Sequence, residues 1–327
     1  MAQPPFIPPT IGVFDSGFGG LTVLRALIEL APQAHYAFIG DTARLPYGSK
    51  SRRTIARYAA QSARFLVEEQ GAEYLVIACN TASALALDAI QEAIPSSVPV
   101  IGVIEPGAEA ARKASKTGDV LVIATDATVH SHAYAAACQA RGLRALERAC
   151  PLLVPLVEEG WVMPSTLNGL LAAQAASAPQ QVAVTAEVVR IYLEELSADA
   201  NAKGMKPDTL VLGCTHYPLL KPVIQRFISS DIKIIDSAES TAEVAARLFN
   251  GRAIPSDTGD SNRGSEPGPP RTGPSPWGGD PGSPRTGPHT WGGIRFFATD
   301  SVEKFERLGS RFLGRPVNNV QLVDLGG

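Results

Sequence analysis

The sequence lacks the features that mark secreted, zinc-binding and membrane proteins. Its four cysteines, Cys79, Cys138, Cys150 and Cys214, are widely spaced and form no C-x-x-C pair, so neither a disulfide framework nor a metal site is indicated. The N-terminal stretch MAQPPFIPPT has neither the positive charges nor the apolar segment of a signal peptide. No run of about eighteen apolar residues follows it. We therefore expect a cytoplasmic protein with reduced thiols.

An excess of charge of one sign is also missing. The formal net charge of −3 is spread along the chain without a dominant block, which excludes the electrostatic footprint of a nucleic-acid-binding protein. No basic amphipathic helix indicates binding to a membrane surface. With 45% apolar and 19% charged residues, the composition is that of a globular protein. Its 327 residues are enough for one large or two medium-sized domains.

Short apolar runs alternate with helical patterns along most of the chain. IGVF precedes LTVLRALIEL, YLVIA precedes SALALDAIQEAI, and the alternation resumes with DVLVIA and TLVLG. This order is typical of βα units that build mostly parallel sheets flanked by helices. We expect two α/β domains, the first made of residues 1–102 and 238–327 and the second of residues 103–237.

Two strand ends in the two halves resemble each other. Residues 74–81 (YLVIACNT) and 209–216 (TLVLGCTH) each contain an apolar strand, a small residue, and then a cysteine with polar neighbours. The strand that ends at residues 15–17 has a similar counterpart that ends at residues 125–126. Open α/β sheets place ligands at the carboxyl ends of their strands. We therefore expect two pseudo-symmetric domains with the active site in the cleft between them.

Cys79 and Cys214 are the first candidates for catalysis. Cys79 lies between a strand and a helix, where backbone N–H groups and the helix dipole favour an anion. A single cysteine in this place is more commonly a small buried hydrophobe. Two strand-end thiols in equivalent contexts are hard to explain by packing alone, so we interpret both as functional. His216, two residues after Cys214, is a candidate for sharing or stabilising a proton.

The glycine-rich segment DSGFGG at residues 15–20 is a second candidate. Its glycines allow close approach of a ligand, and its N–H groups can bind an anion. It matches neither the phosphate-loop pattern G-x-x-x-x-G-K-[ST] nor the full G-x-G-x-x-G pattern. Asp15 and Ser16 add a carboxylate and a hydroxyl suited to an amino acid. These residues are equally compatible with a structural turn and with a ligand loop.

Residues 255–293 differ in composition from the rest of the chain. Of these 39 residues, 19 are glycine or proline, and RTGPSPWGG recurs as RTGPHTWGG. Such a stretch cannot build a core. We interpret it as a disordered insertion in the first domain, with a dedicated binding arm as the alternative.

Seven motifs in order resemble the glutamate racemase family: GVFDSGFGGLTV, GDTARLPYGSK, VIACNTASA, GVIEPG, CPLLVPLVEEG, LGCTHYPLL and IIDSAES. The resemblance covers nearly the whole chain apart from the insertion. It implies a cofactor-independent enzyme that interconverts L- and D-glutamate, supplies D-glutamate for peptidoglycan, and forms a homodimer.

The resemblance also implies roles for individual residues. Cys79 and Cys214 would be the two acid/base residues, with Cys79 acting on the D-enantiomer and Cys214 on the L-enantiomer. Glu158 would assist the thiols together with Asp15 and His216, and we prefer it to Glu159 because it directly follows VPLV. The substrate contacts would be Asp15, Ser16, Tyr47, Gly48, Asn80, Thr81, Thr215 and His216. Thr125 and Thr128 match the family less closely, because the glycines usual in the family do not flank them.

The residues agree with the implied chemistry. Inversion at an α-carbon needs a base on one face, an acid on the other, and stabilisation of the carbanion charge. Two thiols can meet this need, and no cluster of ligands for a metal or pyridoxal cofactor is visible in the sequence. One alternative is a racemase of aspartate or of another acidic amino acid. The other is a non-catalytic amino-acid-binding protein on the same scaffold, against which the presence of both cysteines argues.

Overall fold

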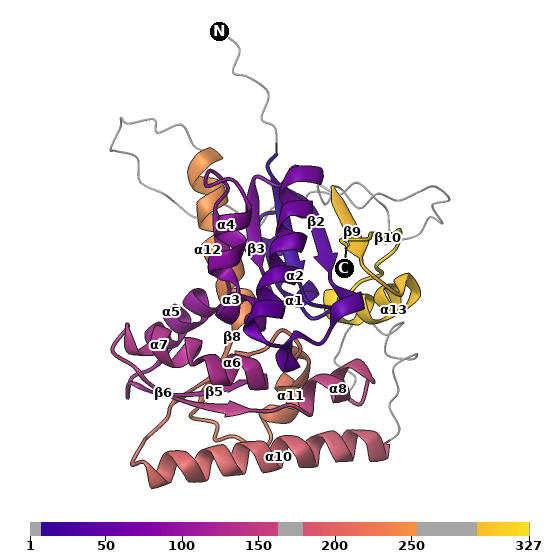
Figure 1. Cartoon of the computed structure of the whole chain (residues 1–327). Coiled ribbons are helices and arrows are strands. Elements are labelled where there is room, and N and C mark those ends of the chain that lie inside the picture. The colour runs from indigo at the N-terminus through magenta and orange to yellow at the C-terminus, as the bar shows by residue number, and fades with distance from the viewer. Residues whose placement is uncertain (1–7, 163–178, 254–292, 327) are drawn as a thin grey trace, which may run out of the picture.

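The computed structural model describes residues 8–162, 179–253 and 293–326 (Figure 1). The glycine- and proline-rich stretch predicted to be disordered lies outside these ranges, apart from Gly293. In the part of the chain that is described, no helix is both long and apolar enough to cross a bilayer.

The first sheet has six strands in the order β10-β9-β2-β1-β3-β4, and all neighbouring pairs are parallel. Its strands are β1 (Thr10–Asp15), β2 (His35–Gly40), β3 (Tyr74–Ile77), β4 (Val100–Gly102), β9 (Ile294–Ala298) and β10 (Gln321–Leu322). The central strands are buried almost throughout, because helices cover both faces of a parallel sheet.

The second sheet has four parallel strands in the order β6-β5-β7-β8. They are β5 (Asp119–Ala124), β6 (Arg144–Ala149), β7 (Thr209–Gly213) and β8 (Lys233–Asp236). This order repeats the order β2-β1-β3-β4 of the first sheet. The structure thus confirms two pseudo-symmetric α/β domains, in which β3 and β7 occupy equivalent places.

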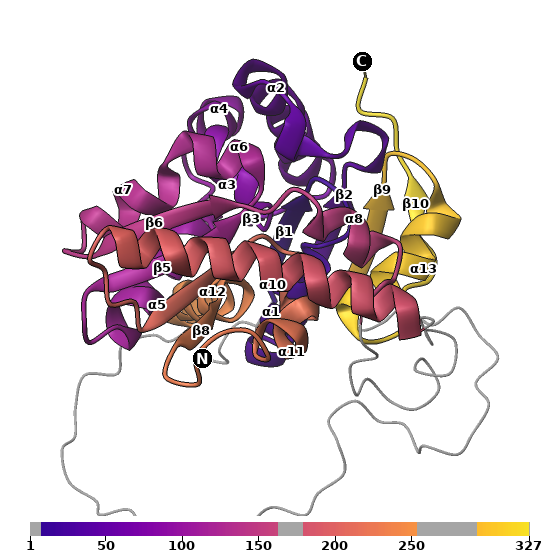
Figure 2. The same ribbon diagram turned by 90° about the horizontal axis from the view of Figure 1, so that it is seen from below.

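The helices flank the two sheets, and α10 runs along the outer edge of the second domain (Figures 1 and 2). The α-helices are α1 (Leu21–Leu30), α2 (Arg52–Arg64), α3 (Asn80–Leu85), α4 (Leu87–Ala93), α5 (Ile104–Ala114), α6 (Asp126–Ser131), α7 (Ala133–Gln139), α8 (Leu153–Glu158), α10 (Pro179–Ala202), α11 (Lys221–Ile224), α12 (Ser237–Ala253) and α13 (Val302–Leu313). Three 3-10 helices are described as η1 (Thr42–Arg44), η2 (Tyr47–Ser49) and η4 (Tyr217–Leu220), and η3 (Phe65–Glu69) is a π-helix.

The chain passes from the first sheet to the second between β4 and β5 and returns after β8. Helix α12 follows β8 directly and packs against α1 of the first domain and against α5. The domain boundaries proposed from the sequence, at residues 102/103 and 237/238, fall within these two passages.

The start of α5 differs from the sequence pattern. The apolar run VPVIGVI at residues 98–104 is a pattern typical of one strand, but β4 ends at Gly102 and the helix already begins at Ile104. Pro106 lies within its first turn, where N–H groups have no partner inside the helix, so the proline is tolerated there.

Candidate active site

The carboxyl ends of β1, β3, β5 and β7 lead into one cavity of about 560 Å³ between the domains. Its lining contains both cysteines and every other site residue predicted from the sequence except Asp15 and, of the two weaker matches, Thr128. The residues that give the cavity its polar side chains and exposed backbone come from both domains: Ser16, Gly17, Tyr47, Gly48, Ser49, Cys79, Asn80, Thr81, Thr125, Asp126, Glu158, Glu159, Cys214, Thr215 and His216.

Cys79 caps the amino terminus of α3. Its sulfur accepts a hydrogen bond from the N–H of Ala82 at 3.4 Å, and its thiol donates to Ser16 Oγ at 3.3 Å. Burial, together with the negative charge of Asp15, raises the pKa of the Cys79 thiol to about 12, although the hydrogen bonds of Ser16 and Ala82 act in the opposite direction. The resting form of Cys79 at neutral pH is therefore the thiol, a proton donor.

Asp15 ends β1 beneath the turn that carries Ser16. Its Oδ2 accepts the N–H of Gly17 at 2.9 Å, while its Oδ1 has no hydrogen-bond partner in the described part of the chain. Burial raises the pKa of this carboxyl, and nearby His216 partly offsets the effect. A Cβ at Gly20 would lie only 2.5 Å from Asp15 Cβ, so a residue without a side chain is needed there. Because Asp15 does not line the cavity, its direct contact with substrate stays a prediction.

Cys214 has a different set of neighbours. His216 places Nδ1 3.9 Å from Cys214 Sγ, and its Nε2 lies 3.2 Å from Glu158 Oε1, at the end of α8. Burial lowers the pKa of His216, but Cys214 and Glu158 outweigh it and raise the pKa to about 10. The imidazole is thus a cation at neutral pH, held between a sulfur and a carboxylate.

The structure separates the two adjacent glutamates. Val157 is buried, and the helix places Glu158 beside His216, whereas Glu159 is exposed at the rim of the cavity. Phe312 of α13 packs edge-on against the other side of the His216 ring, with 5.0 Å between centroids. This aromatic contact was not predicted, because Phe312 lies far away in sequence and in a helix with an ordinary amphipathic pattern.

Three threonines join the domains at the cavity. Thr81 Oγ1 lies 2.9 Å from Thr125 Oγ1 and 3.3 Å from Thr128 Oγ1, and the last two lie 2.9 Å apart. Thr81 and Thr125 line the cavity, while Thr128 is buried behind them. Thr125 and Thr128, which match the family less closely, therefore lie beside Thr81.

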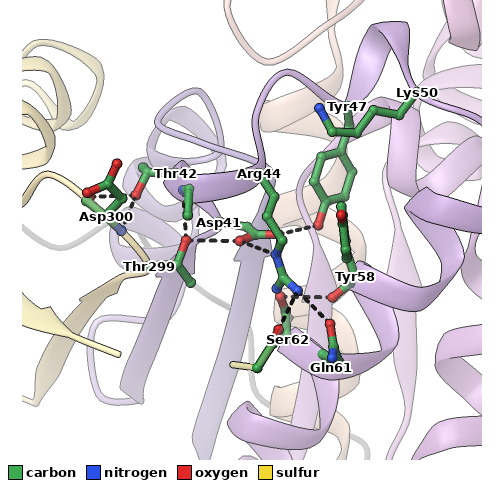
Figure 3. A network of polar contacts seen from close by, with 12 residues as sticks. Asp41, Thr42, Arg44, Tyr47, Lys50, Tyr58, Gln61, Ser62, Thr299 and Asp300 are labelled. Carbon is green, nitrogen blue, oxygen red and sulfur yellow. Dashed lines mark hydrogen bonds and ion pairs between the residues drawn. The ribbon is translucent and has the colours of Figure 1, made fainter. Parts of the chain in front are cut away.

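Tyr47 lines the cavity. Its hydroxyl is already hydrogen-bonded within the protein (Figure 3). The hydroxyl donates to Asp41 Oδ2 at 2.5 Å, and the Nε of Arg44 and the Oγ1 of Thr299 donate to the same carboxylate. These hydrogen bonds therefore fix the loop that contains Tyr47 and Gly48. Burial keeps the pKa of the Tyr47 phenol above its ordinary value. Sequence analysis missed Asp41, although a carboxylate directly after a buried strand was a signal for it.

Comparisons with known proteins agree with this geometry. The model of a family described as Asp/Glu/Hydantoin racemase matches residues 11–245. The chain is 50% identical to a glutamate racemase of Koribacter versatilis over 98% of both chains, and 40% identical to one of Geobacter metallireducens over 96% of both.

Solved structures give the same result. The glutamate racemase isoform RacE1 of Bacillus anthracis superposes with a TM-score of 0.73 at 34% identity, covering 97% of this chain and 98% of that one. The glutamate racemase of Francisella tularensis, solved in complex with D-glutamate, has a TM-score of 0.72 at 31% identity with the same coverage. The chain therefore belongs to the Asp/Glu/hydantoin racemase family, in its glutamate racemase branch.

Proposed function

We propose that this racemase inverts glutamate at the α-carbon with Cys79 and Cys214 as its two proton carriers, needs no added cofactor, and supplies D-glutamate for peptidoglycan. The observation that carries the proposal is that two cysteines, at equivalent strand ends of two pseudo-symmetric sheets, line one cavity. Relatives named glutamate racemase at 40% and 50% identity support glutamate as the substrate.

In the direction from L to D, the Cys214 thiolate removes the α-proton of L-glutamate, and the electron pair of the broken C–H bond stays on the α-carbon. The Cys79 thiol then delivers its proton to the opposite face of that carbon. D-glutamate leaves, Cys79 remains as a thiolate, and Cys214 has become a thiol. The reverse direction exchanges the two roles.

The neighbours of each sulfur favour this starting state. Protonated His216, 3.9 Å from Cys214 Sγ, stabilises negative charge on that sulfur. The raised pKa of Cys79 keeps the second sulfur protonated as the acid. In the reverse direction the hydrogen bonds of Ser16 and Ala82, which lower the pKa of Cys79, would support its thiolate, and Asp15 would assist as the resemblance implies.

Apart from the His216 cation, substrate binding would rely on uncharged donors. In the described part of the chain, no lysine or arginine lines the cavity, whereas Ser16, Asn80 and Thr81 line it from the first domain and Thr215 from the second. Hydroxyl, amide and backbone N–H groups can bind both carboxylates of glutamate in a closed site where water is excluded. The homodimer and the cytoplasmic location implied by the family resemblance stay predictions, and sedimentation of the purified chain tests the first.

The test is to follow the circular dichroism of L-glutamate in heavy water with purified protein and no added cofactor. We expect the signal to decay to zero while deuterium enters the α-position. Aspartate, run in parallel, is expected to react far more slowly. Glutamate that binds but keeps its optical activity and its α-proton would replace this proposal with a binding role.

A further inference from the structure

Asn80 presents an unsatisfied amide to the cavity. It directly follows Cys79, is 3% exposed and lines the cavity. Its Oδ1 accepts a hydrogen bond from the hydroxyl of Tyr134 at 2.7 Å, whereas its Nδ2 has no partner in the described part of the chain. A buried donor without a partner is costly, so native proteins rarely keep one. An acceptor on a molecule in the cavity would satisfy it.

Tyr134 is held tightly in place. It is fully buried near the start of α7, and burial keeps its pKa above the ordinary value, so the hydroxyl retains its proton. The ring lies between two glycines: a Cβ at Gly107 would be 3.2 Å from ring atom Cε1, and a Cβ at Gly213 would be 2.9 Å from Cε2. Because larger residues at either position would displace the ring, α5 and β7 fix where the hydroxyl points.

The bond between Tyr134 and Asn80 also joins the two domains. Tyr134 follows β5 of the second sheet, and Asn80 follows β3 of the first. An asparagine amide can turn over and exchange its oxygen and nitrogen. With the Tyr134 hydroxyl as donor, only one orientation is favourable, and this orientation leaves Nδ2 free for the cavity.

We propose that Tyr134 is a positioning residue of the racemase, which orients the Asn80 amide so that Nδ2 donates to a carboxylate of the bound amino acid. This inference rests on the proposed function and deepens it, since it names the group that sets a substrate contact from the second domain. The hydroxyl also interacts with the side chain of Ser237, but neither Tyr134 nor Ser237 lines the cavity. Tyr134 therefore reaches the substrate only through Asn80.

The experiment is a double-mutant cycle with Tyr134→Phe, Asn80→Ala and the double variant, measured as KM and kcat for both enantiomers. We expect Tyr134→Phe to raise KM about tenfold, since the buried Oδ1 loses its donor, and to change kcat less. Asn80→Ala should raise KM more. In the double variant the loss of the hydroxyl should add nothing, because its effect passes through the amide.

Tyr36→Phe is the matched control. Tyr36 is buried too, and its hydroxyl donates to the backbone oxygens of Leu27 and Ala31, away from the cavity. We expect an unchanged KM. Additive effects in the cycle, a wild-type KM in Tyr134→Phe, or a Tyr134→Phe chain that no longer folds would each overturn the proposal in favour of a purely structural tyrosine.

Gly107→Ala is a second test of the inference, because it leaves the side chains of Tyr134 and Asn80 unchanged. The new Cβ would lie 3.3 Å from the Tyr134 hydroxyl and displace it, while alanine favours the helix that contains it. We expect KM to rise about threefold with no loss of thermal stability; an unchanged KM would contradict the inference. If the wild type binds glutamate without racemising it, the proposed function fails. The same double-mutant cycle, with the Kd for glutamate measured by calorimetry, then still tests the role of Tyr134.

Discussion

The ends of β3 and β7 are equivalent in the fold but not in their chemistry. Cys79 is surrounded by a hydroxyl, an N–H group and the buried Asp15, whereas Cys214 faces an imidazole that is paired with Glu158. The pseudo-symmetry has thus duplicated the sulfur and its position, but not its partners. This difference is consistent with the proposed mechanism, in which the two sulfurs have opposite roles on the two faces of a single carbon.

The largest expected effect comes from removing either sulfur. Cys79→Ser and Cys214→Ser should each lower racemisation roughly a hundred- to ten-thousand-fold, because each removes one of the two acid/base groups. Exchange of the α-proton in heavy water distinguishes the two variants. Cys79→Ser should still exchange L-glutamate slowly without inverting it, and Cys214→Ser should exchange only D-glutamate. Exchange of the opposite enantiomers would reverse the assignment of faces.

The next effect should come from the carboxylate behind His216. Glu158→Gln removes a charge that raises the pKa of His216, so we expect about a tenfold loss of kcat. The activity of the wild type should fall as pH rises through about 10, where His216 loses its proton. In Glu158→Gln this fall should begin at lower pH. Glu159→Gln is the matched control, and an equal effect there would remove the distinction between the two glutamates.

Much of this comparison could be predicted from the sequence. Cys79 and Cys214 each follow an apolar strand, and the alternation of strands and helices fixes the end of a parallel sheet at which they lie. The preference for Glu158 over Glu159 rested on its place directly after VPLV, whereas its position depends on how α8 packs beside His216. The contact with His216 is consistent with that preference, and the role of Glu158 in catalysis stays a prediction.

The sequence could not predict contacts between segments that lie far apart in the chain. Tyr47 was expected at the substrate, but its hydroxyl is taken by Asp41, which is joined to Thr299 more than 250 residues later in the chain. Tyr134 lay in a helical pattern that offered no sign of its bond to Asn80. Such residues look like ordinary core or turn positions until the fold brings their partners close.

A smaller effect is expected from Asp15→Asn. The negative charge of Asp15 raises the pKa of Cys79, so its removal should lower that pKa and make the thiolate available at lower pH. Alkylation of Cys79 by iodoacetamide, followed across pH by mass spectrometry in a Cys214→Ser background, measures the shift. A profile that stays in place would show that burial alone sets the pKa of this thiol.

The smallest effect should come from Ser16→Ala, which tests the same sulfur with the opposite sign. The hydrogen bond between Ser16 and Cys79 lowers the pKa of the thiol, against the larger effect of burial. Its loss should therefore move the alkylation profile of Cys79 to higher pH and lower kcat about threefold, as expected for one weak hydrogen bond. Ser16→Ala should not move the fall in activity near pH 10, since His216 governs it from the other domain. If Ser16→Ala shifts the fall in activity near pH 10, the two sulfurs titrate together. The asymmetry between the ends of β3 and β7 would then be a property of the pair of sulfurs and not of each strand end.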